Sequence, residues 1–366
     1  MTQIEINRKD LIEALRIGGS MSGKSKAIAI LDYAKIVIKG NVLKITSSDT
    51  ECCIAHKMFL NSAVEKECTF VVSPKDLSNA LKSLKGDDVK LWIEDSCIEI
   101  KHANGTMAIP TMPASEFPLP TLEENMRKVA FDSEKLFNLI NRGKEFMSTD
   151  ELHPIMCGVY LYVNNQGYGV ASTDTHKLFT ESVEHDTPVD VEASAVIQAR
   201  AIVPLLNVIN GSANVNVMFG ERQIVFRTEA SMLSIVLPSG MYPRISSVIP
   251  KSSIIECEIN KDEVMDAINR ALLFSNTTGL LTLSIENMLL AISSEDFDTQ
   301  KRSYEECICS SNVPEKFVIG VNGAKFRTCL SAMRGEKVTL KMNAENKPIL
   351  MEEDNSTILL MPMMIS

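Results

Sequence analysis

Asp174 and His176 are the two residues whose types and spacing most suggest chemistry, and they lie in the run Thr-Asp-Thr-His at residues 173–176. Side chains two positions apart point to the same side of a strand. A carboxylate and an imidazole placed in this way could bind a metal ion or exchange protons with a substrate. An enzyme that uses this pair is therefore one hypothesis.

The rest of the chain gives this hypothesis little support. It contains only five histidines, and it has no serine nucleophile elbow, no phosphate-binding glycine loop and no second cluster of carboxylates. The nine cysteines, among them the neighbours Cys52 and Cys53 and the pair Cys307 and Cys309, form no C-x-x-C motif. We expect free thiols in a reducing compartment, and we expect no catalytic activity, no cofactor and no metal site.

The composition is typical of a soluble globular protein, with 45% hydrophobic and 23% charged residues. No apolar run approaches the ~20 residues of a membrane span. The first ten residues, MTQIEINRKD, lack the basic start and the apolar core of a signal peptide. We therefore expect a cytoplasmic protein that is not attached to a membrane.

The chain repeats one pattern three times: a leucine-rich helix that stops at a glycine and runs into alternating strands. The copies are DLSNALKSLKG, IVPLLNVING and RTCLSAMRG, and their glycines are Gly86, Gly211 and Gly335, at intervals of 125 and 124 residues. A second helix recurs upstream of each copy, around Leu11, around Leu136 and around Val264. Repetition at a fixed period predicts three copies of one domain.

Two similar segments mark the ends of the first two copies. MAIPTMPASEFP ends at Pro118 and LSIVLPSGMYP ends at Pro243, 125 residues later. Each is followed by a short polar stretch, which is typical of a brief linker. The predicted domains are residues 1–122, 123–249 and 250–366.

Each predicted domain combines two helices with many short strands. In the first, the runs QIEIN, KIVIKG, VLKITSSD, TFVVS, VKLWIE, CIEIKH and TMAIPT alternate apolar and polar residues, as half-buried antiparallel strands do. The apolar stripe of Leu77, Leu81 and Leu84 would cover such a sheet. This predicts an α+β fold in which the helices pack on one face of antiparallel sheets.

Positive charge is concentrated on the predicted helices. Residues 8–18, 75–86, 133–144, 199–211, 261–271 and 323–336 carry 15 Lys and Arg against 8 Asp and Glu, in a chain with 37 and 47. The helices therefore have a net charge of +7 and the rest of the chain −17. Such helices are suited to face a polyanion, although lysine and arginine are also simply good helix formers. The fifth helix, with three acidic residues, is an exception.

Four collinear segments carry a resemblance to a known family. They are PASEFP at 113–118, GVASTDTHKLFTESV at 169–183, MYPRISSVIP at 241–250 and LLMPM at 359–363. Together with the threefold repeat and the length, they resemble the bacterial DNA polymerase III β subunit, the sliding clamp. The resemblance implies the DNA clamp fold and a head-to-tail homodimeric ring, in which two helices from each domain line a hole for duplex DNA.

The resemblance also implies a function and partners. A clamp encircles duplex DNA without sequence preference and tethers the replicative polymerase, which confers processivity. Its partners, the polymerase and subunits of the clamp loader, bind through short peptide motifs. A clamp-like scaffold for replication or repair factors that does not encircle DNA is the alternative, and the acidic fifth helix favours it.

Basic residues of the helices and of one loop are the candidates for DNA contacts. Lys24 and Lys26 match a loop where the family places a DNA-contacting arginine. The helical candidates are Lys9, Arg16, Lys75, Lys82, Lys85, Lys135, Arg142, Arg200, Arg270, Lys325, Arg327 and Arg334.

Two further sites follow from the resemblance. The peptide pocket lies between the second and third domains in the family, and flexible methionines suit a groove that accepts several apolar motifs. Its residues here would be Met156, Thr173, Thr175, His176, Lys177, Leu178, Pro243, Val248, Met361, Pro362 and Met363. The dimer contact would place edge-strand residues Met107 and Ile109 against Leu272 and Leu273 of the other copy.

This chain departs from the family pattern around the predicted pocket. Thr175 stands where a glycine is usual, Lys177 replaces an arginine and Ser247 occupies a position that is commonly basic. The tail MMIS replaces an ending in Arg-Leu. We therefore expect the peptide preference to be shifted from the commonest clamp-binding motif.

Overall fold

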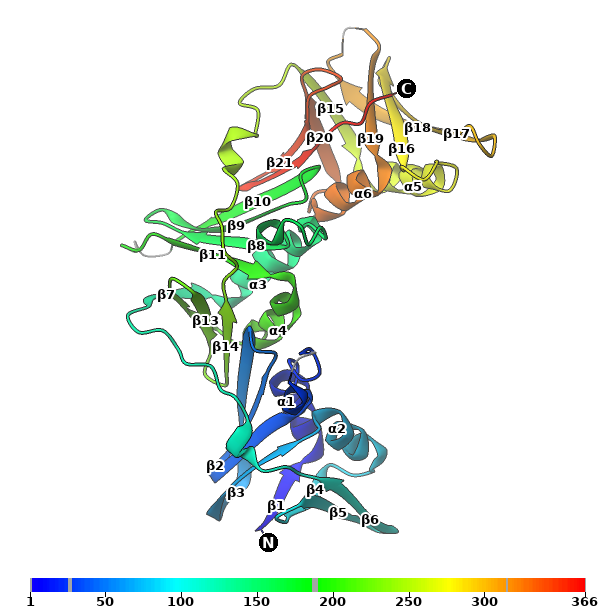
Figure 1. The fold of residues 1–366 in the computed structure, drawn as a ribbon. Helices are drawn as coiled ribbons and strands as arrows, with labels where there is room; N and C mark the ends of the chain where they lie inside the picture. The colour runs from blue at the N-terminus through cyan, green and yellow to red at the C-terminus, as the bar shows by residue number, and fades with distance from the viewer. Residues whose placement is uncertain (1, 26–27, 186–189, 314, 366) are drawn as a thin grey trace. The chain divides into compact units, whose positions relative to one another are not determined.

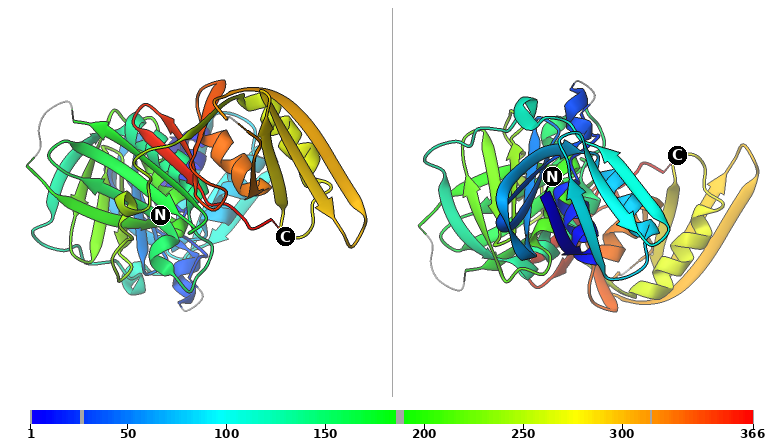
Figure 2. Two further views of the ribbon diagram at one scale, coloured as in Figure 1. Left: turned by 90° about the horizontal axis from the view of Figure 1, so that it is seen from above. Right: turned by 90° about the horizontal axis from the view of Figure 1, so that it is seen from below.

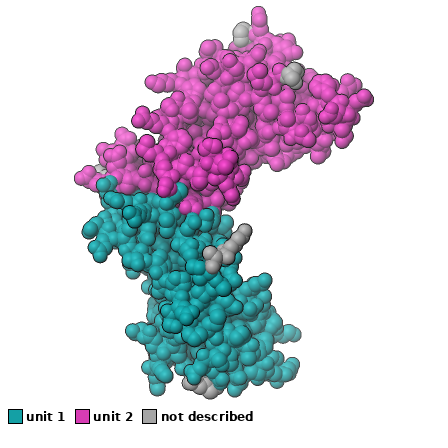
Figure 3. Space-filling model, viewed as in Figure 1, with its two compact units in different colours: residues 1–137, 200–238 teal, residues 138–199, 239–366 magenta. Residues whose placement is uncertain are grey.

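The computed structural model describes residues 2–25, 28–185, 190–313 and 315–365, so that Lys26 lies outside the described residues. The chain forms two compact units (Figures 1 and 3). Unit 1 comprises residues 1–137 and 200–238, and unit 2 comprises residues 138–199 and 239–366. The boundaries of the three predicted domains stay a prediction.

The helices occur where the repeats predict them. In the described part of the chain they are α1 (Arg8–Gly18), α2 (Pro74–Ser83), α3 (Ser133–Gly143), α4 (Ala199–Ile209), α5 (Lys261–Leu272) and α6 (Gly323–Ala332). Asn7, Asn260 and Asn322 cap α1, α5 and α6, because each side-chain oxygen accepts a hydrogen bond from an amide of the first turn.

The helices end earlier than the glycine positions predict. Helix α2 stops at Ser83 and α6 at Ala332, each three residues before its glycine, Gly86 or Gly335. Leu84 and Met333, the residues after these helices, already have extended backbone. Gly86, with φ of 101°, forms the turn into the next strand instead, a conformation that glycine adopts without strain.

Unit 1 contains two antiparallel sheets. Their strands are β1 (Thr2–Asn7), β2 (Ala34–Ser48), β3 (Cys52–Val72), β4 (Asp88–Ile93), β5 (Cys97–His102), β6 (Gly105–Pro110), β7 (Arg127–Asp132), β12 (Asn214–Phe219), β13 (Gln223–Arg227) and β14 (Ser231–Val236). One sheet has the order β1-β4-β5-β6 and the other β2-β3-β14-β13-β12-β7. Helix α1 packs on β2, β3 and α2, and Leu11, Leu77 and Leu81 are buried there with the inward side chains of both sheets.

The strands β2 and β3 are longer than predicted. Two of the predicted runs merge into β2, which continues through a bulge near Gly40. Strand β3 begins at Cys52, in a segment that the alternation did not identify. Cys52 and Cys53 are buried there, and each of the nine cysteines is a free thiol.

Unit 2 contains one long antiparallel sheet, ordered β11-β8-β9-β10-β22-β21-β20-β15-β18-β17-β16-β19. Its strands are β8 (Gly158–Val163), β9 (Gly167–Thr173), β10 (Lys177–Glu184), β11 (Ala193–Gln198), β15 (Ile255–Asn260), β16 (Leu280–Glu286), β17 (Leu289–Asp296), β18 (Lys301–Ser311), β19 (Phe317–Asn322), β20 (Lys337–Met342), β21 (Ile349–Glu353) and β22 (Ser356–Leu360). Helix α5 packs on β17, β18 and α6 (Figures 1 and 2). The α+β fold class is confirmed. Among the described residues, no helix has the length and apolar character needed to cross a membrane.

Candidate functional site

The Thr-Asp-Thr-His run forms the tight turn between β9 and β10. The Asp174 carboxylate organises it, because Oδ1 accepts hydrogen bonds from the amides of His176 at 3.0 Å and Lys177 at 2.8 Å. The Thr173 hydroxyl accepts the amide of Thr175 at 3.1 Å and donates to the Lys177 carbonyl at 2.8 Å. Thr175 has a φ of 73°, which is rare for a β-branched residue. The turn therefore combines local strain with side-chain hydrogen bonds that hold it.

The second oxygen of Asp174 faces two lysines. Lys325 of α6 places Nζ 2.5 Å from Oδ2, and the Nζ of Lys177 lies 3.7 Å from the same atom. Lys177 also donates to the carbonyl of Glu145 and lies 5.0 Å from the centre of the Phe146 ring. One carboxylate thus faces two ammonium groups, one half-buried and one buried, and the three groups together keep a net charge of +1.

Burial and pairing shift the pKa values of these groups. Burial raises the pKa of Asp174, but the hydrogen bonds from Lys325 and from the turn amides outweigh it, and the net pKa is below its ordinary value. Burial lowers the pKa of Lys177, and the attraction of Asp174 offsets only part of this effect. Asp174 is therefore an anion that holds the turn, and its oxygens are already occupied.

The C-terminal segment lies beside this turn. Strand β22 pairs with β10, and Leu178 lies opposite Leu359. These two leucines and Leu350 are buried against Ile245 and Ile249 of the preceding linker. Past the strand, the Met361 amide donates to the His176 carbonyl at 2.7 Å and the Met363 amide to the Gly320 carbonyl at 2.8 Å.

The structure thus brings together two groups of the predicted pocket residues, Thr173–Leu178 and Met361–Met363. Thr175, His176, Pro243, Val248 and Met361 are exposed, whereas Met156, Pro362 and Met363 are partly buried. Three strongly exposed apolar residues that lie close to the predicted pocket residues in the chain were not predicted from the sequence. The sequence indicates such residues only by placing an apolar side chain in a polar loop. The three residues are Leu152, Met241 and Met364.

One pocket prediction needs correction. Lys177 was expected to line the groove, but it is only 7% exposed and its ammonium group points to Glu145 and Phe146. The reason is its place at the start of β10, where the first three residues, Lys177 to Phe179, are all buried. Lys177 therefore connects the turn to Glu145 and Phe146 in the interior of the unit.

Most predicted DNA-contacting residues already have partners within their own unit. The ion pairs are Lys9 with Asp87, Arg16 with Glu13, Arg142 with Glu181, Arg200 with Glu51, Arg270 with Glu305, Lys325 with Asp174 and Arg334 with Glu181. Arg327 donates to the side chain of Asn269. A paired cation can still attract phosphate, but its acidic partner cancels much of its charge.

The remaining candidates are concentrated in unit 1. Lys75, Lys82 and Lys85 on or just after α2 are exposed, and their side chains have no ion pair within the described part of the chain. Lys24 is exposed and its ammonium lies 3.7 Å from the sulfur of Met21. Lys135 on α3 is also exposed. Among the predicted DNA-contacting residues of unit 1, the exposed lysines without an ion pair in the described part of the chain are therefore found mainly on or just after α2.

Arg142 is the clearest correction among the DNA candidates. Its side chain is 12% exposed, pairs with Glu181 and Glu353, and donates to the Ala332 carbonyl. Arg334 binds the other oxygen of Glu181 at 2.6 Å. Burial lowers the pKa of Arg142, and the two glutamates compensate in part. Arg142 therefore holds α3 to the end of α6 and to β21, and it is not available to phosphate.

Met107 and Ile109, two of the predicted dimer residues, lie on β6, and Leu272 and Leu273 lie at the end of α5. Strand β6 is the edge of its sheet, and β18 pairs with β15 only through Cys309–Ser311. Met107 is partly exposed, Leu272 is partly exposed, and Leu273 is 75% exposed. Ile109 is wrong as a contact residue, because it points into the core of its own unit. Tyr304 and Ile308 on β18 are exposed apolar residues that the sequence did not suggest.

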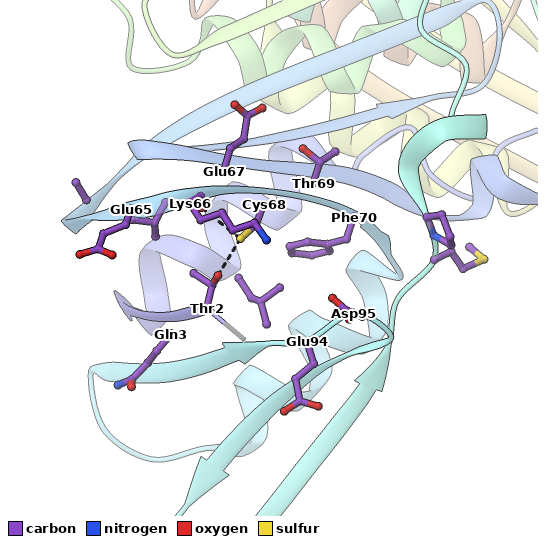
Figure 4. A pocket seen from close by; sticks show the side chains of 15 residues that line it. Thr2, Gln3, Glu65, Lys66, Glu67, Cys68, Thr69, Phe70, Glu94 and Asp95 are labelled. Atoms are coloured by element: carbon purple, nitrogen blue, oxygen red, sulfur yellow. Dashed lines mark hydrogen bonds between the residues drawn. The ribbon is translucent and has the colours of Figure 1, made fainter.

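A cavity of about 600 Å³ in unit 1 lies between β1, β3 and the end of β4 (Figure 4). Its lining includes Glu65, Glu67, Glu94 and Asp95 but only one lysine, Lys66. An acidic lining repels phosphate. No predicted site residue lines this cavity.

Comparison with known proteins defines the class of protein. Residues 2–122 match the N-terminal domain of the DNA polymerase III beta subunit, residues 130–244 its central domain, and residues 246–364 its C-terminal domain. The chain therefore belongs to the DNA polymerase III beta subunit family, with three clamp domains in order. The resemblance seen in the sequence is confirmed.

Curated relatives and solved structures agree along the full length. The beta sliding clamp of Rickettsia bellii is 24% identical, with 96% of each chain covered, and that of Pseudomonas aeruginosa is 23% identical, with 98% of each covered. A crystal structure of the Pseudomonas aeruginosa sliding clamp bound to griselimycin covers all of both chains with a TM-score of 0.93 and 21% identity. The fold is thus closely kept while most side chains differ.

Proposed function

We propose that this chain is a sliding clamp that encircles duplex DNA as a head-to-tail homodimeric ring and tethers a DNA polymerase III. The observation that carries the proposal is the match of all three family domains, in order and over almost the whole chain. The three-domain division near residues 122 and 249 and a cytoplasmic location belong to the same proposal. Lys24 and the α2 lysines supply attraction to phosphate, which is independent of sequence and allows sliding.

The partner-binding site of this proposal is the surface around the β9–β10 turn and Met361–Met363. The exposed methionines and Val248 offer adaptable apolar contacts, and His176 offers a polar one at the rim. A short apolar peptide from a polymerase or a clamp-loader subunit suits this chemistry. Because Thr175 and Ser247 depart from the family pattern at exposed positions, the preferred motif differs from the commonest one in this proposal.

The ring closes in this proposal by pairing β6 of one copy with the open edge of β18 of the other. Each strand offers unpaired backbone groups, which favour addition of another strand. Leu272 and Leu273 at the end of α5 and Met107 on β6 supply the apolar contacts of the interface. A closed head-to-tail dimer uses each of these edges once per copy.

The enzyme hypothesis is not favoured by the geometry of Asp174. Its carboxylate is held by two turn amides and by Lys325, so that a proton transfer would have to break these bonds. We propose that the chain acts without catalysis of its own. The non-encircling scaffold is favoured by one observation, the acidic exposed side of α5, where Arg270 is paired with Glu305.

Primer extension on a primed circular template tests the function. The polymerase III and clamp loader come from the same cells, and the chain is added or left out. The proposal expects long products only when the chain is present, and much shorter ones with a folded Leu273→Asp variant whose ring cannot close. Product lengths that do not depend on the chain would contradict the clamp function.

A further inference from the structure

Lys325 lies on α6, a helix that the family resemblance assigns to DNA, yet its ammonium group contacts the turn between β9 and β10. Nζ is 2.5 Å from Oδ2 of Asp174. The Lys325 side chain is 29% exposed and that of Asp174 only 13%. An ion pair that is largely shielded from water keeps much more of its attraction than a fully exposed one.

Asp174 transmits this contact to the backbone of the turn. Its other oxygen accepts the amides of His176 and Lys177. Between them and Asp174 lies Thr175 with its positive φ, a conformation that persists only where the surroundings enforce it. The position of the Asp174 carboxylate therefore decides the shape of the turn.

The turn in turn positions the C-terminal segment. The carbonyl of His176 accepts the amide of Met361 at 2.7 Å. The exposed side chains of His176 and Met361 are thus attached to backbone segments that are hydrogen-bonded to each other. A shift of the turn moves both.

Lys177 cannot take over the role of Lys325. Its Nζ is 3.7 Å from Asp174, beyond hydrogen-bond distance, and it is already bound to the Glu145 carbonyl. Cys329, also on α6, offers no second cation, because burial raises the pKa of its thiol to about 12. Among these groups, Lys325 is the one that donates a side-chain hydrogen bond to Asp174.

We propose that Lys325 is a positioning residue for peptide binding. From α6 it fixes Asp174, and through Asp174 it holds His176 and the Met361 segment in the arrangement that receives an apolar peptide. This inference rests on the proposed peptide site. It moves Lys325 from the DNA-contacting set to the partner-binding set, and it makes helix α6 a support for the peptide site.

Variants of the full-length chain test the proposal, with griselimycin as the probe, because a similar clamp is known bound to it. Calorimetric titration measures binding to the wild type and to Lys325→Met, Lys325→Arg, Asp174→Asn and the double variant Lys325→Met with Asp174→Asn. The matched control is Lys337→Met, which removes an exposed lysine of unit 2 that pairs with Glu258. Thermal unfolding shows whether each variant is folded.

The proposal expects Lys325→Met to bind about five- to tenfold more weakly, because the competent turn is less populated. Lys325→Arg should restore binding to within about twofold, and Lys337→Met should bind like the wild type. The double variant should bind griselimycin no more weakly than the weaker-binding single variant, because both substitutions remove the same ion pair. Hydrogen exchange at the His176 and Lys177 amides should become faster in Lys325→Met while the β10 strand stays protected.

Three outcomes would overturn it. Unchanged binding and exchange in Lys325→Met would show that the ion pair does not position the turn. Additive losses in the double variant would show that Lys325 and Asp174 act separately. A wild-type chain that does not bind griselimycin would remove the proposed peptide site, and this inference with it, which is a distinct failure.

Discussion

At the scale of single residues, the β9–β10 turn shows why a short motif can mislead. Asp174 and His176 have the types and spacing of an acid–base pair, but the carboxylate is used for structure and the imidazole is exposed at the rim. The chemistry of a side chain depends on which of its atoms are still free. In Asp174 both oxygens accept hydrogen bonds from the turn or from Lys325, and the carboxylate serves to shape a surface.

Thr175→Gly is expected to leave the chain as stable as it is or to stabilise it by up to about 1 kcal/mol. Glycine relieves the strain of a positive φ, although it adds entropy to the unfolded chain and loses the contact of the threonine hydroxyl with His176. Urea denaturation measures the change. Thr277→Gly in an exposed loop without positive φ is the control and should destabilise. Equal losses in the two variants would argue against strain at Thr175.

The low pKa of Asp174 predicts how its contribution depends on pH. A carboxyl group whose folded pKa lies below its unfolded value of about 3.9 stabilises fully above that value. The contribution is lost as the pH falls from there through the folded pKa. The difference in melting temperature between wild type and Asp174→Asn should thus be constant from neutral pH to about pH 5 and shrink below about pH 4. A difference that changes mainly near pH 6 to 7 would point to a histidine.

At the scale of helices and strands, charge pairing distinguishes basic residues that look alike in the sequence. The simultaneous change of Lys75, Lys82 and Lys85 to Ala should lower the salt dependence of duplex DNA binding, with a loss of up to about 0.9 per phosphate contact in the logarithmic slope. Arg270→Ala, whose guanidinium is paired with Glu305, is the control and should change the slope little. Fluorescence anisotropy at several salt concentrations measures both. Equal slopes for the triple variant and the wild type would exclude α2 from the DNA contact.

The end of α5 and the free strand edges carry the prediction for assembly. Leu272→Ala together with Leu273→Ala should raise the dimer dissociation constant by at least about tenfold. Truncating each leucine weakens the free energy of association by about 2 kcal/mol or more where its side chain is fully buried in the interface. Sedimentation at decreasing concentration measures it. Leu152→Ala, another strongly exposed leucine, is the control. A double variant that remains as dimeric as this control would place the interface elsewhere.

How much could be predicted from the sequence differs between elements and contacts. The repeats predicted the helices, because their apolar spacing and their capping asparagines are local properties. The full lengths of β2 and β3 were not predicted. Two predicted runs merge into β2, because a bulge near Gly40 lets the hydrogen bonding with β3 continue where the alternation breaks. The pairing of Lys325 with Asp174 joins residues 151 positions apart, and no local pattern encodes it. The burial of Arg142 escaped for the same reason.

At the scale of the whole molecule, the proposed function follows from geometry. In the proposed ring, three copies of one domain in each chain give six in a dimer, and positive charge facing the hole holds DNA without reading its sequence. The peptide surface then connects the ring to its enzyme. Neither the holding of DNA nor the tethering of the enzyme resides in a single residue. Both require that two chains form a closed ring.

Negative-stain electron microscopy of the purified chain shows directly whether the ring is closed. We expect closed rings of two chains with six similar lobes and a central hole wide enough for duplex DNA. Compact particles without a hole, or single open crescents at concentrations where the chain is a dimer by sedimentation, would contradict it and favour the scaffold.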